Sequence, residues 1–318
     1  MVGMFNRLEL VDGQELARRV SMLEATRGLQ SLLRSGFDPA AALPRQILDV
    51  AHGQLLLMPA EAGRWAGQKF ATVAPANPAR GLERIQGLYI LLDGETLAPV
   101  ALLDGTELTS IRTPAVSAAV IDVLAEPDAS DLVVFGTGPQ GIRHVEAMAA
   151  IRPTITRVTL IGRDAERAEQ AVAAVRAMGL EARVGSPDDV RDADIVVAAT
   201  TAREPLFDGA LVRDHVAIAA VGSHEPDARE LPGDLVGRSQ VVVETDAVAR
   251  AEAGDVIMAV GEGRLGFDAA VPMRDIVAGE VAVDRSRPRI VKTCGMGWQD
   301  LCVAGLAVRA QAHSGEGR

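Results

Sequence analysis

The stretch that most constrains this chain is a run of four apolar residues, 132–135, followed directly by glycines in the spacing G-x-G-x-x-G. A buried strand that ends in such a turn, just before a helical pattern, is typical of a loop that cradles a dinucleotide. Gly136 permits the turn, Gly138 lets the backbone approach a pyrophosphate, and Gly141 lets the helix pack close to its strand. A purely structural turn is the alternative. The predicted cofactor-binding loop is Gly136, Thr137, Gly138, Pro139, Gln140 and Gly141.

Beyond this loop, short apolar runs alternate with helical patterns as far as about residue 244. Such βαβ repetition predicts an α/β fold with a doubly wound, Rossmann-type parallel sheet that carries helices on both faces. We therefore expect residues 126–298 to form an NAD(P)-binding domain.

The part of the chain before the loop combines helical and extended patterns. A helix is predicted at 21–34, and strands at 67–73, 87–93 and 100–103, which indicates an α+β domain with a largely antiparallel sheet. A second helix is predicted to begin at Thr113, with Pro114 in its first turn. The helical tail from Trp298 onward could pack back on this half, so we expect residues 1–125 with 299–318 to form the substrate-binding domain.

Composition excludes several classes of function. The net charge is -11 and the 32 basic residues are scattered, which argues against a nucleic-acid partner. The start shows no export signal and no run is long enough to span a bilayer, so we expect a cytoplasmic protein without a membrane partner. Cys294 and Cys302 are the only cysteines, and without a Cys/His cluster we expect no metal.

The end of the strand after the glycine loop bears on the choice of dinucleotide, because an acidic residue there accepts hydrogen bonds from the adenosine ribose. If Gly162 is the selecting residue, no carboxylate opposes a 2′-phosphate, and Arg163 and Arg167 could pair with it. NADP(H) is then favoured over NAD(H). In the alternative interpretation Asp164 is the acidic selector and Arg163 is a solvated surface charge.

Motifs spread from about Pro44 to Leu301 make the chain resemble the ornithine cyclodeaminase/mu-crystallin family. The segments that carry the resemblance are 44–45, 57–59, 69, 75–78, 81–82, 110–117, the glycine loop, 222–227, 230–231 and 297–301. The family includes cyclodeaminases, alanine and opine-type dehydrogenases, and reductases of cyclic ketimines such as pyrroline- and piperideine-2-carboxylate. The resemblance implies an NAD(P)-binding domain joined to a substrate domain whose sheet builds a homodimer.

The resemblance also implies which residues handle a small imino or amino acid. Arg45 and Arg112 are expected to clamp its carboxylate, a task that suits the planar guanidinium fork. Lys69 is expected to contact the substrate, and a partly desolvated lysine beside two arginines has a lowered pKa, which suits proton transfer to or from nitrogen. For each arginine a surface ion pair is the alternative, and for Lys69 the alternative is an exposed lysine on an edge strand. Thr113, Ser117 and Thr200 are predicted cofactor contacts, with simple helix capping as the alternative for the first two.

Two departures from the family pattern concern the substrate. Ornithine cyclodeaminases resemble this chain but carry an aspartate where it has His224, and a glutamate where it has Leu56. The loss of both carboxylates argues against ornithine and favours a cyclic ketimine carboxylate or an alanine-like acid. His224 itself is a candidate proton shuttle, with a solvated surface histidine as the alternative.

These observations together predict an NAD(P)H-dependent oxidoreductase acting on the C=N or CH–NH bond of a small imino or amino acid. An ornithine cyclodeaminase that forms proline and ammonia is the first alternative. A nonenzymatic NADPH-binding protein similar to mu-crystallin is the second. Asp300, at the head of the last predicted helix, is interpreted as a helix cap.

Overall fold

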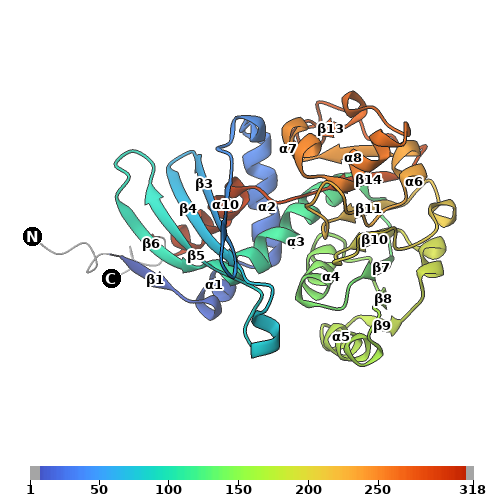
Figure 1. The fold of residues 1–318 in the computed structure, drawn as a ribbon, viewed down its shortest axis with the longest axis horizontal. Helices are drawn as coiled ribbons and strands as arrows, with labels where there is room; N and C mark the ends of the chain where they lie inside the picture. The colour runs from blue at the N-terminus through green and yellow to red at the C-terminus, as the bar shows by residue number, and fades with distance from the viewer. Residues whose placement is uncertain (1–7, 313–318) are drawn as a thin grey trace, which may run out of the picture. The chain divides into compact units, whose positions relative to one another are not determined.

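The computed structural model describes residues 8–312, which divide into two compact units (Figure 1). The first unit contains the chain up to Thr113 and from Gly295 onward, and the second runs from Pro114 to Cys294. The seven N-terminal residues, on which the expected lack of an export signal rests, lie outside the described part.

The first unit is built on a six-stranded sheet in the order β1-β6-β5-β4-β3-β2, antiparallel except where β1 runs parallel to β6. The largely antiparallel sheet predicted from the sequence is therefore confirmed. Its helices include α1, α2 and α10, and α10 packs against β3, β4 and α2 (Figure 1). The elements are β1 (Glu9–Val11), α1 (Gly13–Arg19), α2 (Met22–Arg34), β2 (Gln46–Val50), β3 (Gly53–Ala62), β4 (Trp65–Val73), β5 (Ile85–Asp93), β6 (Pro99–Asp104) and α10 (Gly297–Ala312).

The second unit is a Rossmann-type fold, as predicted. Its eight strands are all parallel, in the order β13-β12-β14-β11-β10-β7-β8-β9. The strands are β7 (Asp131–Phe135), β8 (Arg157–Ile161), β9 (Glu181–Val184), β10 (Ile195–Ala198), β11 (Ala217–Ala220), β12 (Gln240–Val243), β13 (Val271–Pro272) and β14 (Arg289–Lys292). The helices are α4 (Pro139–Ile151), α5 (Ala165–Ala177), α6 (Gly233–Arg238), α7 (Asp246–Ala251), α8 (Gly254–Gly261) and α9 (Met273–Ala278).

The direction of strand addition changes beside β7. From β7 the chain adds β8 and β9 on one side of the sheet, and β10, β11 and the remaining strands on the other. In open parallel sheets, ligands bind at the carboxyl ends of the strands at such a switch point. The glycine loop follows β7 directly, so the topology places it at the binding edge.

The helix predicted to begin at Thr113 begins earlier. Helix α3 spans Gly105–Leu124 and contains Pro114 in its interior, so the predicted start is wrong. The side chain of Asp104 accepts hydrogen bonds from the N–H groups of Thr106 and Glu107, at 2.8 and 2.9 Å, and satisfies donors of the first turn. Proline often marks the start of a helix, but α3 contains Pro114 in its interior and lacks the one backbone hydrogen bond that its missing N–H would make.

Two structural absences hold for residues 8–312. None of the helices in this range is long and apolar enough to cross a bilayer. The same range contains no group of three or more His, Cys, Asp or Glu side chains arranged to hold a metal ion.

Candidate functional site

The first unit contains a buried ion cluster centred on Lys69. Strand β4 presents this side chain to α10, where its Nζ lies 2.9 Å from Oδ1 and 2.8 Å from Oδ2 of Asp300. The same Nζ donates to Oγ1 of Thr109, on α3, at 3.3 Å. Lys69 is 2% exposed and Asp300 is fully buried, so the ammonium group is held by the protein instead of by bulk water.

The surroundings of Lys69 make it suitable for proton transfer. Burial lowers the pKa of Lys69 to about 8; the charge of Asp300 opposes this, and the charges of Arg112 and Arg45 add to it. The direction expected from the sequence, a lowered pKa beside two arginines, is confirmed. A group with this pKa exists in both protonation states near neutral pH, which general acid–base catalysis requires.

Arg112 is oriented by two residues at the start of α10. Its Nη1 donates to Oε1 of Gln299 at 2.9 Å, and its Nε lies 3.4 Å from Oδ1 of Asp300. A Cβ at Gly295 would lie only 2.6 Å from Nη1, and φ at this residue is +88°, so both space and backbone conformation call for glycine. Arg45 is partly buried and directly precedes β2. The structure thus brings Arg112 and Lys69 together around one carboxylate.

Asp300 is the residue that the sequence interpretation missed. Helix α10 begins at Gly297, so Asp300 lies within the first turn, and its carboxylate is part of the ion cluster instead of capping the helix. The cap interpretation is therefore wrong. The segment 297–301, which helps to carry the resemblance, contains Asp300 and could have marked it as a site residue. Acidic residues are, however, common in the first turn of a helix, so Asp300 did not stand out.

Tyr89 lies beside the cluster. It is paired with Lys69 in the β4–β5 register, and a Cβ at Gly67 would lie 2.3 Å from its hydroxyl oxygen. The residues that the structure describes offer this buried hydroxyl no hydrogen-bond partner. Burial, with the nearby charge of Asp300, raises the pKa of Tyr89 well above its usual value, so the phenol stays neutral.

The second unit contains the glycine loop, and its geometry fits a dinucleotide. Gly136 has φ +114°, and a Cβ there would lie 2.3 Å from the carbonyl oxygen of Ala199. A Cβ at Gly141 would lie 1.9 Å from the carbonyl oxygen of Gly136, so helix and strand pack closely. Gly138, at the N-cap of α4, has no atom within 4 Å of the corresponding position. Open space in front of a helix N-terminus with free N–H groups suits a pyrophosphate.

The end of β8 is shaped by the same loop. A Cβ at Gly162 would lie 2.7 Å from Cγ2 of Thr137, so the loop residue occupies the space of a side chain. Oδ1 of Asp164 accepts the N–H of Arg167 at 3.1 Å and caps α5. Arg163 and Arg167 are both exposed. One oxygen of Asp164 therefore holds the helix, and the other lies 3.8 Å from Nε of Arg167. Both guanidinium groups are nevertheless exposed.

The remaining predicted contacts, Thr113, Ser117, Thr200 and His224, differ in their surroundings. Ser117 lies inside α3, is fully buried, and its Oγ is 3.1 Å from Nε2 of His144. Because neither it nor Thr113 stands at a helix N-terminus, the helix-start argument for their contact with a cofactor fails, and their assignment rests on the resemblance alone. Thr200 follows β10 and bonds to Glu230, whereas His224 is exposed in the loop after β11.

The protonation of His144 can be worked out from its partners. Burial lowers its pKa to about 4, so the ring is neutral. Nδ1 lies 2.7 Å from the carbonyl oxygen of Gln140, which can only accept, so Nδ1 carries the hydrogen and Nε2 accepts from the hydroxyl of Ser117. The side chain ties α3 to the first turn of α4.

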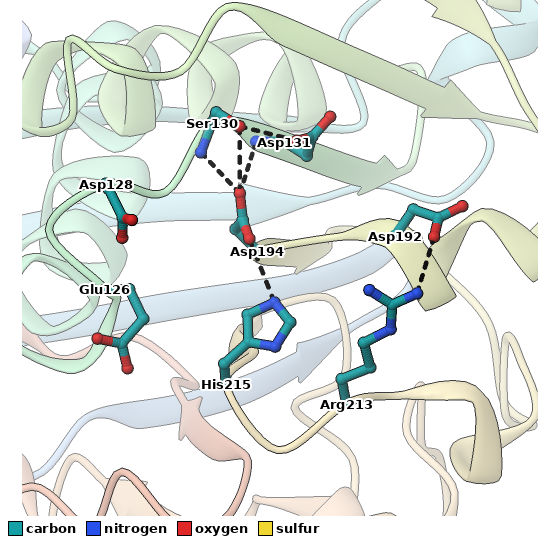
Figure 2. Close-up of a pocket in the computed structure, with 8 residues that line it drawn as sticks. All are labelled: Glu126, Asp128, Ser130, Asp131, Asp192, Asp194, Arg213 and His215. Atoms are coloured by element: carbon teal, nitrogen blue, oxygen red, sulfur yellow. Dashed lines mark hydrogen bonds and ion pairs between the residues drawn. The ribbon is translucent and has the colours of Figure 1, made fainter.

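A hollow of about 470 Å³ in the second unit lies at the amino ends of β7, β10 and β11 (Figure 2). Oδ2 of Asp194 accepts the N–H groups of Ser130 and Asp131 at 2.7 and 3.0 Å, and its Oδ1 lies 3.2 Å from Nε2 of His215. Ligands of parallel sheets bind at the opposite, carboxyl ends. We therefore interpret Asp194 as a residue that stabilises the amino ends of these strands, and not as part of the cofactor-binding or substrate-binding site.

Several known proteins are similar to this chain in sequence and in fold. Residues 14–316 match the model of the ornithine cyclodeaminase/mu-crystallin family. Delta(1)-pyrroline-2-carboxylate reductase 2 of Burkholderia ambifaria is 36% identical over 256 residues, which cover 80% of each chain. The structure of Delta(1)-pyrroline-2-carboxylate reductase of Thermococcus litoralis, in complex with NADH and L-proline, superimposes with a TM-score of 0.90 at 27% identity, covering 97% of this chain and 98% of that one. An archaeal alanine dehydrogenase dimer with bound NAD gives a TM-score of 0.89 at 25% identity, covering 96% and 97%.

Proposed function

Because this chain belongs to the ornithine cyclodeaminase/mu-crystallin family, we propose that it is a nicotinamide-dependent reductase of a small cyclic imino acid. The observation that carries the proposal is the buried Lys69, whose pKa is lowered to about 8 and which lies between Asp300 and Arg112. A nonenzymatic binding protein has no need of a buried lysine with this pKa. The activities of the similar proteins, pyrroline-2-carboxylate reductase and alanine dehydrogenase, support the same class of reaction.

In this proposal the protein positions the substrate and moves a proton. Arg112, held by Gln299 and Asp300, binds the substrate carboxylate together with Arg45. Lys69 donates a proton from Nζ to the imine nitrogen, and Asp300 keeps that Nζ in place. A nicotinamide cofactor held at the glycine loop would supply, when bound, the hydride that the α-carbon needs. The C=N bond thus gains one hydride and one proton and becomes CH–NH.

The choice of substrate rests on the two missing carboxylates. Leu56, on β3, is partly buried and cannot pair with the side-chain ammonium group of ornithine. His224 stands where a cyclodeaminase carries an acid, so no carboxylate base is available at that position. A cyclic ketimine such as pyrroline- or piperideine-2-carboxylate needs neither group, which is why we favour it over ornithine.

A spectrophotometric screen tests the proposal. Purified protein is mixed with pyrroline-2-carboxylate, piperideine-2-carboxylate, pyruvate with ammonia or methylamine, and ornithine, each with NADH and with NADPH. We expect oxidation of the reduced cofactor with the cyclic ketimines. Release of ammonia from ornithine without net change in nicotinamide absorbance would establish a cyclodeaminase instead. Tight cofactor binding without turnover of any compound would leave only the binding-protein alternative.

The same screen tests the choice of cofactor. We propose a preference for NADPH, because Arg163 and Arg167 are exposed beside Gly162 while Asp164 caps α5. The Thermococcus litoralis enzyme was captured with NADH, so relatives do not supply this argument. An equal or higher kcat/KM with NADH would reject the preference.

We further propose that the chain forms a homodimer in the cytoplasm through the six-stranded sheet. The strand register places large exposed apolar residues on one face of that sheet: Leu10, Leu48, Phe70, Leu88 and Ile90. A contiguous apolar face of this kind is costly in water unless a partner covers it. Sedimentation equilibrium of wild type and Leu88→Glu tests the dimer, with Met178→Glu, an exposed position of the second unit, as control. A monomeric wild type would refute it.

A further inference from the structure

A second buried ion cluster lies in the second unit, outside the groups that the proposed reaction uses. It consists of Lys292 at the end of β14, Asp255 at the start of α8, and Glu230 in the loop after β11. Lys292 and Asp255 are each 1% exposed and Glu230 is fully buried. Burying three charged groups costs several kcal/mol per ion unless they are paired and hydrogen-bonded, so such a cluster needs a reason.

Glu230 connects the loops that follow two neighbouring strands. Its Oε1 accepts both the N–H and the hydroxyl of Thr200, after β10, at 2.7 Å each. Its Oε2 accepts the N–H of Gly222, after β11, at 2.7 Å. A Cβ at Gly222 would lie 2.0 Å from the carbonyl oxygen of Thr200, so the two loops touch and the position admits no side chain.

The other two members hold Glu230 and the loop around it. Oδ1 of Asp255 accepts the N–H groups of Glu230 and Leu231 at 2.7 and 2.8 Å, and its Oδ2 lies 3.3 Å from Nζ of Lys292. Nζ of Lys292 also donates to the carbonyl oxygen of Ser223, directly before His224. Burial opposes the charge of Lys292, but Asp255, Cys294 and Glu230 together outweigh burial and raise the pKa of Lys292, so the ammonium stays protonated.

The position of the cluster relates it to the cofactor. The glycine loop after β7 is the pyrophosphate site, and the adenosine half of a dinucleotide lies toward the end of β8. A dinucleotide spans the switch point, so its nicotinamide half lies toward the ends of β10 and β11. Those are the two strands whose following loops Glu230 joins.

We propose that Glu230 is a positioning residue that fixes the Thr200 and Gly222 loops as the seat of the nicotinamide half of the cofactor, with Asp255 and Lys292 holding it in place. This inference rests on the nicotinamide dependence proposed above. The proposed role explains why residue 230 is a glutamate and not its amide, glutamine. Three donors converge on its two oxygens, and a glutamine would turn its NH₂ group toward at least one N–H.

Binding measurements on Glu230→Gln test the proposal without relying on turnover. The probes are NADPH or NADH, whichever the wild-type chain binds more tightly, and the matching ADP-ribose fragment that lacks the nicotinamide. We expect the Kd of the whole cofactor to rise about tenfold, as for the loss of a hydrogen bond to a charged group, while that of the fragment changes less than twofold. Glu181→Gln, the same change at an exposed residue at the amino end of β9, is the control and should alter neither.

Two outcomes would overturn the proposal: an equal loss for both probes, which indicates a general structural role, or no loss for either. If Glu230→Gln does not fold, Thr200→Val serves as a second variant, because it removes one of the three donors to Glu230. We expect it to raise the Kd of the whole cofactor less than Glu230→Gln would, again with little effect on the fragment. Thr200→Ser keeps the hydroxyl and should restore wild-type binding. Equal binding by Thr200→Val and wild type would then refute it. A wild-type chain that binds neither dinucleotide would refute the proposed function itself, and this inference with it.

Discussion

The chain contains two lysines among its 32 basic residues, and the two lie in different buried clusters. Burial lowers the pKa of Lys69 to about 8, since Asp300 is outweighed once the charges of Arg112 and Arg45 add to the effect of burial. Lys292 is buried as deeply, but Asp255, Cys294 and Glu230 raise its pKa. The pKa of a lysine side chain thus differs between two buried environments because the charged neighbours differ. One ammonium group is able to lose its proton near neutral pH, and the other serves as a fixed donor.

The largest expected effect comes from removing each lysine in turn. Lys69→Met should lower kcat about 10³-fold, the range in which a general acid contributes. Lys292→Met should lower the free energy of unfolding by about 3–5 kcal/mol, because it leaves two buried carboxylates without a counter-charge. Turnover assays and urea unfolding on both variants check the contrast. If Lys69→Met turns over normally, the role assigned to Lys69 is wrong.

The next effect is the pH dependence of the reaction. Imine reduction needs Lys69 protonated, so kcat/KM should be flat below pH 8 and fall about tenfold per pH unit above it; amine oxidation should rise through the same pH. The pKa values can be read directly by NMR of selectively labelled lysine, because the chain yields only two signals and Lys69→Met assigns them. A signal of Lys69 that titrates no lower than that of Lys292 would break the comparison.

A smaller effect is expected from Asp300→Asn. The charge of Asp300 raises the pKa of Lys69, so its removal should move the fall in kcat/KM to lower pH and reduce the rate at pH 8 by about tenfold. The amide keeps its size and can still accept from Nζ, which separates the effect of charge from that of packing. An unchanged pH profile would show that Asp300 acts on Lys69 by position alone.

Much of the architecture was predictable from local sequence patterns. The glycine loop after an apolar strand predicted the Rossmann-type sheet, and the alternation of the N-terminal half predicted an antiparallel one. Both sheets could be predicted because the period of hydrophobic residues and the spacing of glycines are local features, each contained within a few neighbouring residues. The start of α3 was missed for the same reason: Pro114 is a strong local signal, but the cap at Asp104 and the packing of the whole helix outweigh it.

The sequence by itself determined the class of cofactor, because the spacing of the glycines is a local signal. The family, and with it the candidates Arg45, Lys69 and Arg112, followed from the motifs that carry the resemblance. It did not reveal that Asp300 pairs with Lys69, 231 positions earlier, or that Glu230 joins the loops after β10 and β11. Only the tertiary structure decided which carboxylate pairs with which lysine. These ion pairs help to set the pKa of each ammonium group, because in a buried site the nearest charges act without the screening that water provides.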